Sequence, residues 1–503
     1  MRARLRHDRS LDDNHMTRTS QTHPLQIAVV DALSGHGRIG VTICPGKKQP
    51  GALTGAWDRD LGLDVEAIAD WGAVAVLTLV EPHELTALKV EGLGAEVEAR
   101  HMDWLHAPIR DVSTPDARFE MVWAKIGEGL RDRLRAGFSI LVHCKGGLGR
   151  AGMITARLLV ELGVPAEEAI RRVRAARPGA IETTAQEAFV RGCQPVAEAV
   201  PSTTAQAIQD RAQGAFMGLA MGDAVGTTLE FASRDSRPLL IDMVGGGPFR
   251  LQAGEWTDDT AMAVALADSL LASNGLNEQD LLSRFTAWWR EGVYSCTGRC
   301  FDIGATTAQA LTRWEQSKAD HCGATDPHSA GNGSLMRLAP VAIRYWNDRR
   351  ALRDAAARQS KTTHAAPEAV DACVVYAEMM ADAIEGRRRS EVLAARPGDW
   401  AGRIAAVNSG SWRGRARGEI DATGYVAHSM EAALWAVGRA PAFDRAVLHA
   451  ANLGQDADTT AAIAGQLAGA LVGAADLPVI WAERLAWAPR IRHMAKELRN
   501  GGG

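Results

Sequence analysis

The sequence predicts a multidomain protein, with an N-terminal α/β domain followed by a C-terminal all-α domain. Three observations predict this: a length of 503 residues, an alternation of strand-like and helical segments up to about residue 197, and long alanine-rich helical patterns beyond residue 205. Because a domain takes roughly 150 residues, a chain of this length is expected to hold two or three.

Composition places the chain among soluble globular proteins. Hydrophobic residues make up 46% and charged residues 23%, which excludes global disorder and a fibrous class. The net charge of -4 excludes a strongly basic protein, so nucleic acid is not an expected partner. No apolar run approaches the roughly 18 residues that span a bilayer, so no membrane partner is expected. The 7 cysteines have no paired spacing and favour reduced thiols in a cytoplasmic protein.

The expected domain boundaries follow changes in composition. Residues 1–25 are charged and lack the apolar segment of a secretory signal, so we expect a disordered tail, with Met16 as an alternative start. The α/β domain is predicted over residues 26–198. The small and polar stretch 199–206 is the predicted linker, and the all-α domain is predicted over residues 207–497.

Each element of the first domain has its own signal. The continuous apolar runs 74–80 and 138–144 are typical of strands buried on both faces, and residues 24–30 also read as a strand. Residues 119–136 and 150–162 have helical spacing of apolar side chains. Strands that alternate with helices predict a mostly parallel sheet.

The second domain shows almost no strand signal. Alanine-rich patterns with helical spacing predict helices over residues 261–271, 367–384, 426–437 and 459–471. This half of the chain is therefore expected to be all-α.

A cysteine at the end of the second buried run begins a motif with a specific chemistry. His143 and Cys144 precede the loop Lys145, Gly146, Gly147, Leu148, Gly149, and Arg150 follows at a helix start. The backbone N–H groups of such a loop and the helix N-terminus form a cradle for an anion and stabilise a thiolate. Arg150 offers a planar fork for two phosphoryl oxygens. The motif predicts nucleophilic attack on phosphorus through a phosphocysteine; the alternative is an inert cysteine before a glycine turn.

Residues 26–195 resemble the cysteine-dependent protein tyrosine and dual-specificity phosphatases, particularly the kinase-associated phosphatase branch. The resemblance rests on the cysteine motif and on segments 108–115 and 177–186. It implies that residues 145–150 bind phosphate and that Cys144 and Arg150 are catalytic.

The same resemblance implies further roles. Asp111 matches the general acid, with Asp116 as the competing candidate, and Gln186 matches the glutamine that orients the hydrolytic water. Ala151 stands where many members carry Ser or Thr, so hydrolysis of the intermediate is expected to be slow.

Two strings of acidic residues precede alanine-rich helices in the second domain. The first string is Thr257, Asp258, Asp259, and the second is Asp456, Ala457, Asp458, Thr459. Crowded carboxylates repel one another unless a cation lies between them, and hard divalent cations prefer oxygen ligands. Together the strings could hold two metals about 3.5–4 Å apart. The alternative is two ordinary helix N-caps.

Residues 208–475 resemble the ADP-ribosylglycohydrolase family, typified by the dinitrogenase-reductase-activating glycohydrolases. Besides the acidic strings, the resemblance rests on a helix with glycines at residues 214, 218 and 222, on segment 330–340, on Thr363 and His364, and on segment 424–435. It implies that two Mg²⁺ or Mn²⁺ ions are bound by Thr257, Asp258, Asp259, Asp456, Asp458 and Thr459. It also implies catalytic roles for Glu230 and Asp258, and an ADP-ribose pocket bordered by Asn332, Gly333, Ser334, His364 and Tyr425. Ordinary packing remains the alternative for His364 and Tyr425.

The two resemblances together imply a fusion of two hydrolases. The second domain is expected to remove ADP-ribose from a modified protein or small molecule, with arginine favoured over serine or a nucleic-acid base as the linked group. The first is expected to be a phosphatase acting on a phosphoprotein or a phosphorylated ADP-ribose compound. The alternative is a phosphate-binding module that recruits targets without turnover.

Overall fold

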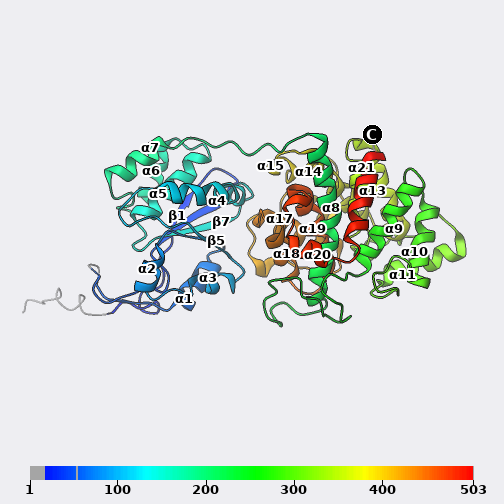
Figure 1. The fold of residues 1–503 in the computed structure, drawn as a ribbon, viewed down its shortest axis with the longest axis horizontal. Helices are drawn as coiled ribbons and strands as arrows, with labels where there is room; N and C mark the ends of the chain where they lie inside the picture. The colour runs from blue at the N-terminus through cyan, green and yellow to red at the C-terminus, as the bar shows by residue number, and fades with distance from the viewer. Residues whose placement is uncertain (1–16, 53–54, 502–503) are drawn as a thin grey trace, which may run out of the picture. The chain divides into compact units, whose positions relative to one another are not determined.

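The computed structural model describes residues 17–52 and 55–501 and divides into two compact units, Met1–Ala197 and Glu198–Gly503. The first unit is α/β and the second is helical, which confirms the predicted fold class (Figure 1).

The first unit alternates strands and helices along the chain. Its elements are β1 (Ala28–Asp31), β2 (Arg38–Thr42), β3 (Lys48–Gln49), β4 (Trp57–Asp58), α1 (Leu61–Asp70), β5 (Ala73–Thr78), α2 (Pro82–Ala87), α3 (Leu93–Glu98), β6 (Asp103–His106), α4 (Ala117–Arg135), β7 (Ser139–His143), α5 (Gly149–Glu161), α6 (Ala166–Ala176) and α7 (Thr184–Gly192). The predicted helices and the two predicted buried strands are confirmed within a few residues at each end.

The main sheet has the strand order β1-β2-β7-β5-β6, and only β1 runs antiparallel to its neighbour. Every residue of β5 and β7 is buried because these strands lie inside the sheet with both faces covered. In a parallel sheet of this kind, ligands bind at the carboxyl ends of the strands. The carboxyl end of β7 is the point where Cys144 follows.

The described part of the expected N-terminal tail is attached to this unit. Ser20 Oγ donates to Asp64 Oδ1 at 2.8 Å, and Arg59 Nη1 donates to the His23 carbonyl at 2.8 Å. Residues 17–25 thus belong to the folded unit, while residues 1–16 lie outside the described part of the chain.

The second unit is built from helices. They are α8 (Ala205–Gly226), α9 (Asp258–Ala272), α10 (Glu278–Glu291), α11 (Ala305–Ser317), α12 (Ala339–Arg344), α13 (Arg349–Thr363), α14 (Pro367–Glu385), α15 (Arg389–Val392), α16 (Gly402–Asn408), α17 (Val426–Arg439), α18 (Phe443–Ala451), α19 (Ala457–Val472), α20 (Val479–Arg484) and α21 (Ala488–Gly501), with short 3-10 turns between some of them. The four helices predicted in this half are confirmed.

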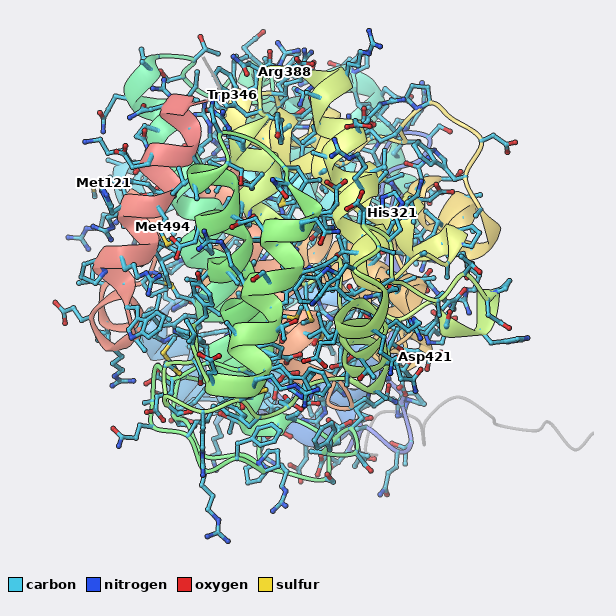
Figure 2. The ribbon with its side chains drawn as sticks, turned by 90° about the vertical axis from the view of Figure 1, so that its right-hand side faces the viewer. Met121, His321, Trp346, Arg388, Asp421 and Met494 are labelled. Atoms are coloured by element: carbon cyan, nitrogen blue, oxygen red, sulfur yellow. The ribbon has the colours of Figure 1, made fainter. Side chains whose placement is uncertain are left out.

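The long helices of the second unit are buried on most sides. α8, α9, α14 and α19 bury most of their side chains. Helix α21 packs against α8 and α9 and carries Met494, whose side chain is buried (Figure 2). No helix in the described ranges is long and apolar enough to cross a membrane, and all seven cysteines are free thiols.

Candidate active sites

Cys144 lies at the carboxyl end of β7 and is almost fully buried, with 3% of its surface exposed. The loop that follows approaches the end of β2 very closely. Gly147 has a φ of +66°, and a Cβ there would lie 2.5 Å from the Thr42 carbonyl oxygen. Only glycine can make this approach, so the glycine in the motif lets the loop fold back over the strand end.

Arg150 is held in one orientation in the first turn of α5. Its Nη1 and Nη2 atoms lie 2.5 and 2.9 Å from the two carboxylate oxygens of Glu84, and Nη1 also donates to the Ile109 carbonyl. Burial raises the pKa of Glu84, but the hydrogen bonds from Arg150 and the backbone outweigh it, so the pKa lies below its usual value. Glu84 is therefore ionised. Sequence reasoning missed it because its segment, at the start of α2, carries no motif.

A chain of hydrogen bonds fixes the ring of His143, the residue before Cys144. Trp104 Nε1 can only donate, and it donates to Thr78 Oγ1 at 2.9 Å. The same Thr78 hydroxyl lies within hydrogen-bond distance of His143 Nε2, 2.8 Å away. Burial lowers the pKa of His143 to about 3, so the ring is neutral. The neutral ring is held by the hydrogen bond between its Nε2 atom and the Thr78 hydroxyl.

The structure gives the two candidate acids different surroundings. Asp111 Oδ1 lies 3.0 Å from Arg150 Nη2, and its side chain is 54% exposed. Asp116 is the N-cap of α4, where its Oδ1 accepts a hydrogen bond from the Phe119 backbone N–H at 2.9 Å. Asp111 is therefore brought to the cradle, while the carboxylate of Asp116 serves a helix end.

Gln186 reaches the same cradle from α7. It is fully buried, and a Cβ at Gly149 would lie 3.0 Å from its side-chain amide. Its Oε1 accepts from the Glu182 backbone N–H, and its Nε2 donates to the Ser113 carbonyl. The last bond ties Gln186 to the segment that carries Asp111.

Lys47 is a further cation at the cradle, and sequence reasoning missed it. Its Nζ lies 3.5 Å from the Lys145 carbonyl and 4.5 Å from the ring centroid of Trp57. Burial lowers the pKa of Lys47 to about 8. A buried amine of this kind gains its charge most readily when an anion lies beside it.

In the second unit, helices α8 and α19 touch through their backbones. A Cβ added at Gly214, Gly218, Gly222 or Gly226 would lie 2.1–2.3 Å from a carbonyl oxygen of α19. The glycines of α8 therefore permit a separation that no larger residue allows. This contact places the end of α8 against the start of α19, where Asp456 and Asp458 lie.

Asp223 near the end of α8 organises the start of α9. It accepts hydrogen bonds from the backbone N–H and hydroxyl of both Thr257 and Thr260. The two acidic strings, about 200 residues apart in the sequence, thus meet beside one buried aspartate. Asp223 had no predicted role, because a single acid after a glycine-spaced helix carries no motif.

Where the two acidic strings meet, there are more carboxylate oxygens than N–H and O–H protons to form hydrogen bonds with them. Thr257 Oγ1 lies 2.9 Å from Asp223, 3.1 Å from Asp259 and 3.2 Å from Asp458, yet a hydroxyl has one proton. Asp259 Oδ1 is buried without a hydrogen-bond partner. Ligand oxygens of Asp223, Asp259 and Asp458 lie within 4.8 Å of one another, as do those of Glu230, Asp456 and Asp458. A cluster with this deficit of positive charge fits divalent cations with oxygen ligands.

Burial and mutual repulsion raise the pKa of these carboxyls. The pKa of Asp258 and Asp259 lies well above the usual value, first because of burial and then because of neighbouring carboxylates. The same causes raise the pKa of Asp223 and Asp456 to about 7. The acidic strings therefore require compensating positive charge to be ionised together at neutral pH.

A cavity of about 690 Å³ opens beside the acidic cluster. Its polar lining includes Glu230, Asp258, Asp302, Asn332, His364, Asp456, Asp458 and Thr459. The Glu230 carboxylate accepts hydrogen bonds from the Ala457 and Asp458 backbone N–H groups at the start of α19. Asp302 was missed by sequence reasoning, because it is a lone acid in an irregular segment before α11. Burial and the carboxylate of Asp458 raise its pKa to about 9.

The residues expected to border the ADP-ribose pocket divide into two groups. Asn332, Gly333 and His364 line the cavity, and Asn332 Nδ2 donates to Asp456 Oδ2 at 2.6 Å. Ser334 is buried and is not among the lining residues of the cavity, and its hydroxyl lies 2.8 Å from the hydroxyl of Ser360. Tyr425 is not among the lining residues, and its hydroxyl donates to Glu368 at 2.7 Å.

The chain resembles known proteins over both units. The family model for ADP-ribosylglycohydrolase matches residues 204–502, and a model described as Swiss Army Knife protein, DSP-PTPase phosphatase domain, matches residues 49–190. The ADP-ribosylarginine hydrolase Tri1 of Pseudomonas putida strain GB-1 is 46% identical over 289 residues, which are 58% of this chain and 78% of that protein. The Tri1 protein of Serratia proteamaculans strain 568 is 43% identical over 290 residues, 58% of this chain and 79% of that protein.

A solved structure gives a similar result for the helical unit. The structure titled ADP-ribosylglycohydrolase-related protein complex is 36% identical, with a TM-score of 0.53, and the match covers 59% of this chain and 99% of that chain. Because the first family model covers more than half of the sequence, the chain belongs to the ADP-ribosylglycohydrolase family, and it carries a dual-specificity phosphatase-type domain before the family domain.

Proposed function

We propose that the helical unit removes ADP-ribose from arginine, with two bound Mg²⁺ or Mn²⁺ ions, and that the α/β unit hydrolyses phosphate esters at Cys144. The observation that carries the first part is the buried cluster of carboxylates whose oxygens exceed their protons, at the wall of a cavity large enough for a nucleotide-sized ligand. The two ADP-ribosylarginine hydrolases at 46% and 43% identity support arginine as the linked group.

The residues proposed to hold the ions are those at the starts of α9 and α19. They are Thr257, Asp258, Asp259, Asp456, Asp458 and Thr459. When bound, such cations supply positive charge beside the reacting ribose and make a nearby water more acidic. Asp223 is proposed to hold Thr257 in place through the hydrogen bonds described above.

Proton transfer is proposed for the carboxylates that line the cavity. Glu230 is fixed by two backbone N–H groups at one oxygen, Oε2, which leaves its other oxygen to accept a proton from the attacking water. Water oxygen bonds to the anomeric carbon, the carbon–nitrogen bond breaks, and the guanidine that leaves takes up a proton. The transition state carries positive charge on the ribose ring, which the surrounding carboxylates stabilise.

Release of ADP-ribose from free ADP-ribosylarginine tests this proposal. We expect Mn²⁺ or Mg²⁺ to be required and Asp258→Asn to lower kcat/KM by about 100-fold or more. Asp354→Asn, on the exposed surface of α13, is the control and should leave the rate unchanged. Unaltered release by Asp258→Asn, or full activity in a chelator, contradicts the assignment.

For the α/β unit, we propose attack by Cys144 on phosphorus, with Arg150 binding two phosphoryl oxygens and Asp111 protonating the leaving oxygen. The substrate proposed is a phosphoprotein or a phosphorylated ADP-ribose compound. Cys144→Ser should abolish phosphate release from an aryl phosphate while ADP-ribose release continues. Equal phosphate release by Cys144→Ser and the wild type contradicts a cysteine mechanism.

A second function for this unit is recruitment of phosphorylated targets without turnover. The buried Ala151, which supplies no hydroxyl beside the thiolate, favours it. Rapid-mixing kinetics distinguish the two. Binding of an aryl phosphate with neither a burst nor turnover supports recruitment. A burst of one product equivalent followed by slow turnover instead supports attack by Cys144 with slow hydrolysis of the phosphocysteine, and in that case Ala151→Ser should raise the steady-state rate.

A further inference from the structure

The cavity of about 690 Å³ beside the acidic cluster is called the acidic cavity below. A second cavity, of about 680 Å³, adjoins it. The two share Glu230 and Phe231 in their walls. We call the second cavity the apolar groove and define it by the side chains of Phe231, Pro238, Leu239, Ile241, Val244 and Pro248. Its lining also includes Arg237, which with Glu230 supplies its charged groups.

The apolar groove exposes large hydrophobic side chains beside a proposed active site. Ile241 is 73% exposed, Phe231 67% and Val244 56%, and Ile241 is the most exposed large apolar side chain in the described part of the chain. Contiguous apolar surface of this kind marks a binding site more often than scattered exposed residues do.

The backbone of the groove is pinned to the helical unit at several points. Leu240 exchanges two hydrogen bonds of 2.9 Å with the side chain of Asn452. Asp242 accepts from Trp481 Nε1 and Arg484 Nη1. Residues 239 and 241 flank the buried Leu240, so an anchored segment holds their side chains outward.

Phe231, in the shared wall, is fixed by its backbone. Its φ of +59° is unusual for a bulky residue. A hydrogen bond of 2.7 Å from its N–H to the Gln455 carbonyl, and another of 2.7 Å from the Gln455 N–H to the Ala232 carbonyl, hold this conformation. The exposed ring is therefore part of a preformed surface that borders both cavities.

We propose that the apolar groove binds an apolar side chain of the substrate protein, close in sequence to the ADP-ribosylated arginine. The inference rests on the proposed function: the acidic cavity takes the ADP-ribosyl group, and the arginine remains part of a polypeptide that must lie across the adjoining surface. Apolar walls suit a leucine-like side chain. With one arginine in the lining, they suit a pyrophosphate poorly.

Three substrates test the proposal with the full-length protein and Mn²⁺. They are free ADP-ribosylarginine and two synthetic peptides with a central ADP-ribosylarginine, flanked on both sides by Leu in one peptide and by Ser in the other. We expect the wild type to prefer the Leu peptide by about 10-fold in kcat/KM, and Ile241→Ser and Val244→Ser to remove that preference. Both variants should hydrolyse free ADP-ribosylarginine at the wild-type rate. The control is Val200→Ser, a 65% exposed β-branched residue that lines neither cavity.

Several results would overturn the proposal. Equal wild-type rates on the two peptides, or an equal loss on free ADP-ribosylarginine and on the Leu peptide, exclude recognition of a flanking side chain. A 10-fold weaker inhibition by free ADP-ribose in Ile241→Ser assigns the groove to the adenosine part of the ligand instead. A change from dimer to monomer in Ile241→Ser assigns it to a second copy of the chain. If none of the three substrates is hydrolysed, the proposed function fails together with this inference, whereas hydrolysis without peptide preference leaves the proposed function intact.

Discussion

Asp111 and Asp116 lie on the same short segment before α4, and their contacts separate two roles that the sequence left open. Asp111 meets Arg150, while Asp116 accepts the backbone N–H of Phe119 at the helix start. Sequence spacing alone could not distinguish them, because both lie near Pro115 and the distinction depends on a side chain from α5.

Replacing each aspartate by asparagine tests this separation. Asp111→Asn removes the proton donor and should lower kcat for an aryl phosphate by about 100-fold. Asp116→Asn keeps an oxygen that caps helices as well as aspartate does, so activity and Tm should stay near the wild type. A larger kinetic loss in Asp116→Asn than in Asp111→Asn would show that the assignment is reversed.

The lowered pKa of Lys47 predicts a pH dependence of anion binding. Lys47 is charged below about pH 8 and loses its charge as the pH rises through that value. In Cys144→Ser protein, which lacks the thiol, affinity for tungstate should fall about 5-fold between pH 7 and pH 9. Calorimetric titration measures this, and Lys47→Arg should bind with little change over the same range.

The stability effect of the same group has a defined sign. Because the folded-state pKa lies below the unfolded value of 10.5, the folded protein binds fewer protons between about pH 8 and pH 10.5. Burial of the Lys47 charge therefore lowers the free energy of unfolding below pH 8, and this loss of stability disappears as the pH rises. Lys48→Arg, at the neighbouring exposed lysine, is the control for the pH dependence of tungstate affinity and of the free energy of unfolding. A steep decline of tungstate affinity with rising pH in Lys47→Arg would contradict the role given to Lys47.

At the scale of elements, motifs in one continuous stretch were predictable and contacts between stretches were not. The Cys144 loop and both acidic strings carry their signal in adjacent residues. Glu84 and Asp302 are single acids in ordinary segments, and their importance comes from partners that the fold brings to them. Helices and buried strands followed from periodicity, but the meeting of α8, α9 and α19 at Asp223 required the packing itself.

The backbone contact between α8 and α19 predicts a large effect of one methyl group. A Cβ in Gly218→Ala would lie 2.3 Å from the Gly465 carbonyl oxygen, so the helices must separate. We expect a loss of at least about 2 kcal/mol in the free energy of unfolding, and weaker Mn²⁺ binding because the acidic strings move apart. Denaturant unfolding and calorimetry measure the two effects.

Gly418→Ala is the matched control for this variant. Gly418 has open space around its position and no positive φ, so an added methyl group meets nothing. Wild-type stability in Gly218→Ala would show that the two helices are not in backbone contact.

For the whole molecule, the division into two units predicts that ligands stabilise them separately. Each unit has its own core and its own candidate site. Mn²⁺ should raise the unfolding temperature of the helical unit alone, because the buried carboxylates there gain compensating charge. Tungstate should raise the unfolding temperature of the α/β unit alone. Differential scanning calorimetry of wild type, Cys144→Ser and Asp258→Asn assigns the transitions, and a single transition shifted by both ligands would contradict independence.

The glycines of α8 also set a lower limit on the separation of α8 and α19. Their backbone atoms are already in contact, so the two main chains cannot close further around a small ion. Asp223 on α8 also holds Thr257 at the start of α9, so the same helix positions residues of both acidic strings. We therefore expect an ion smaller than the site requires to be bound less tightly, because only the carboxylate side chains can adjust to it.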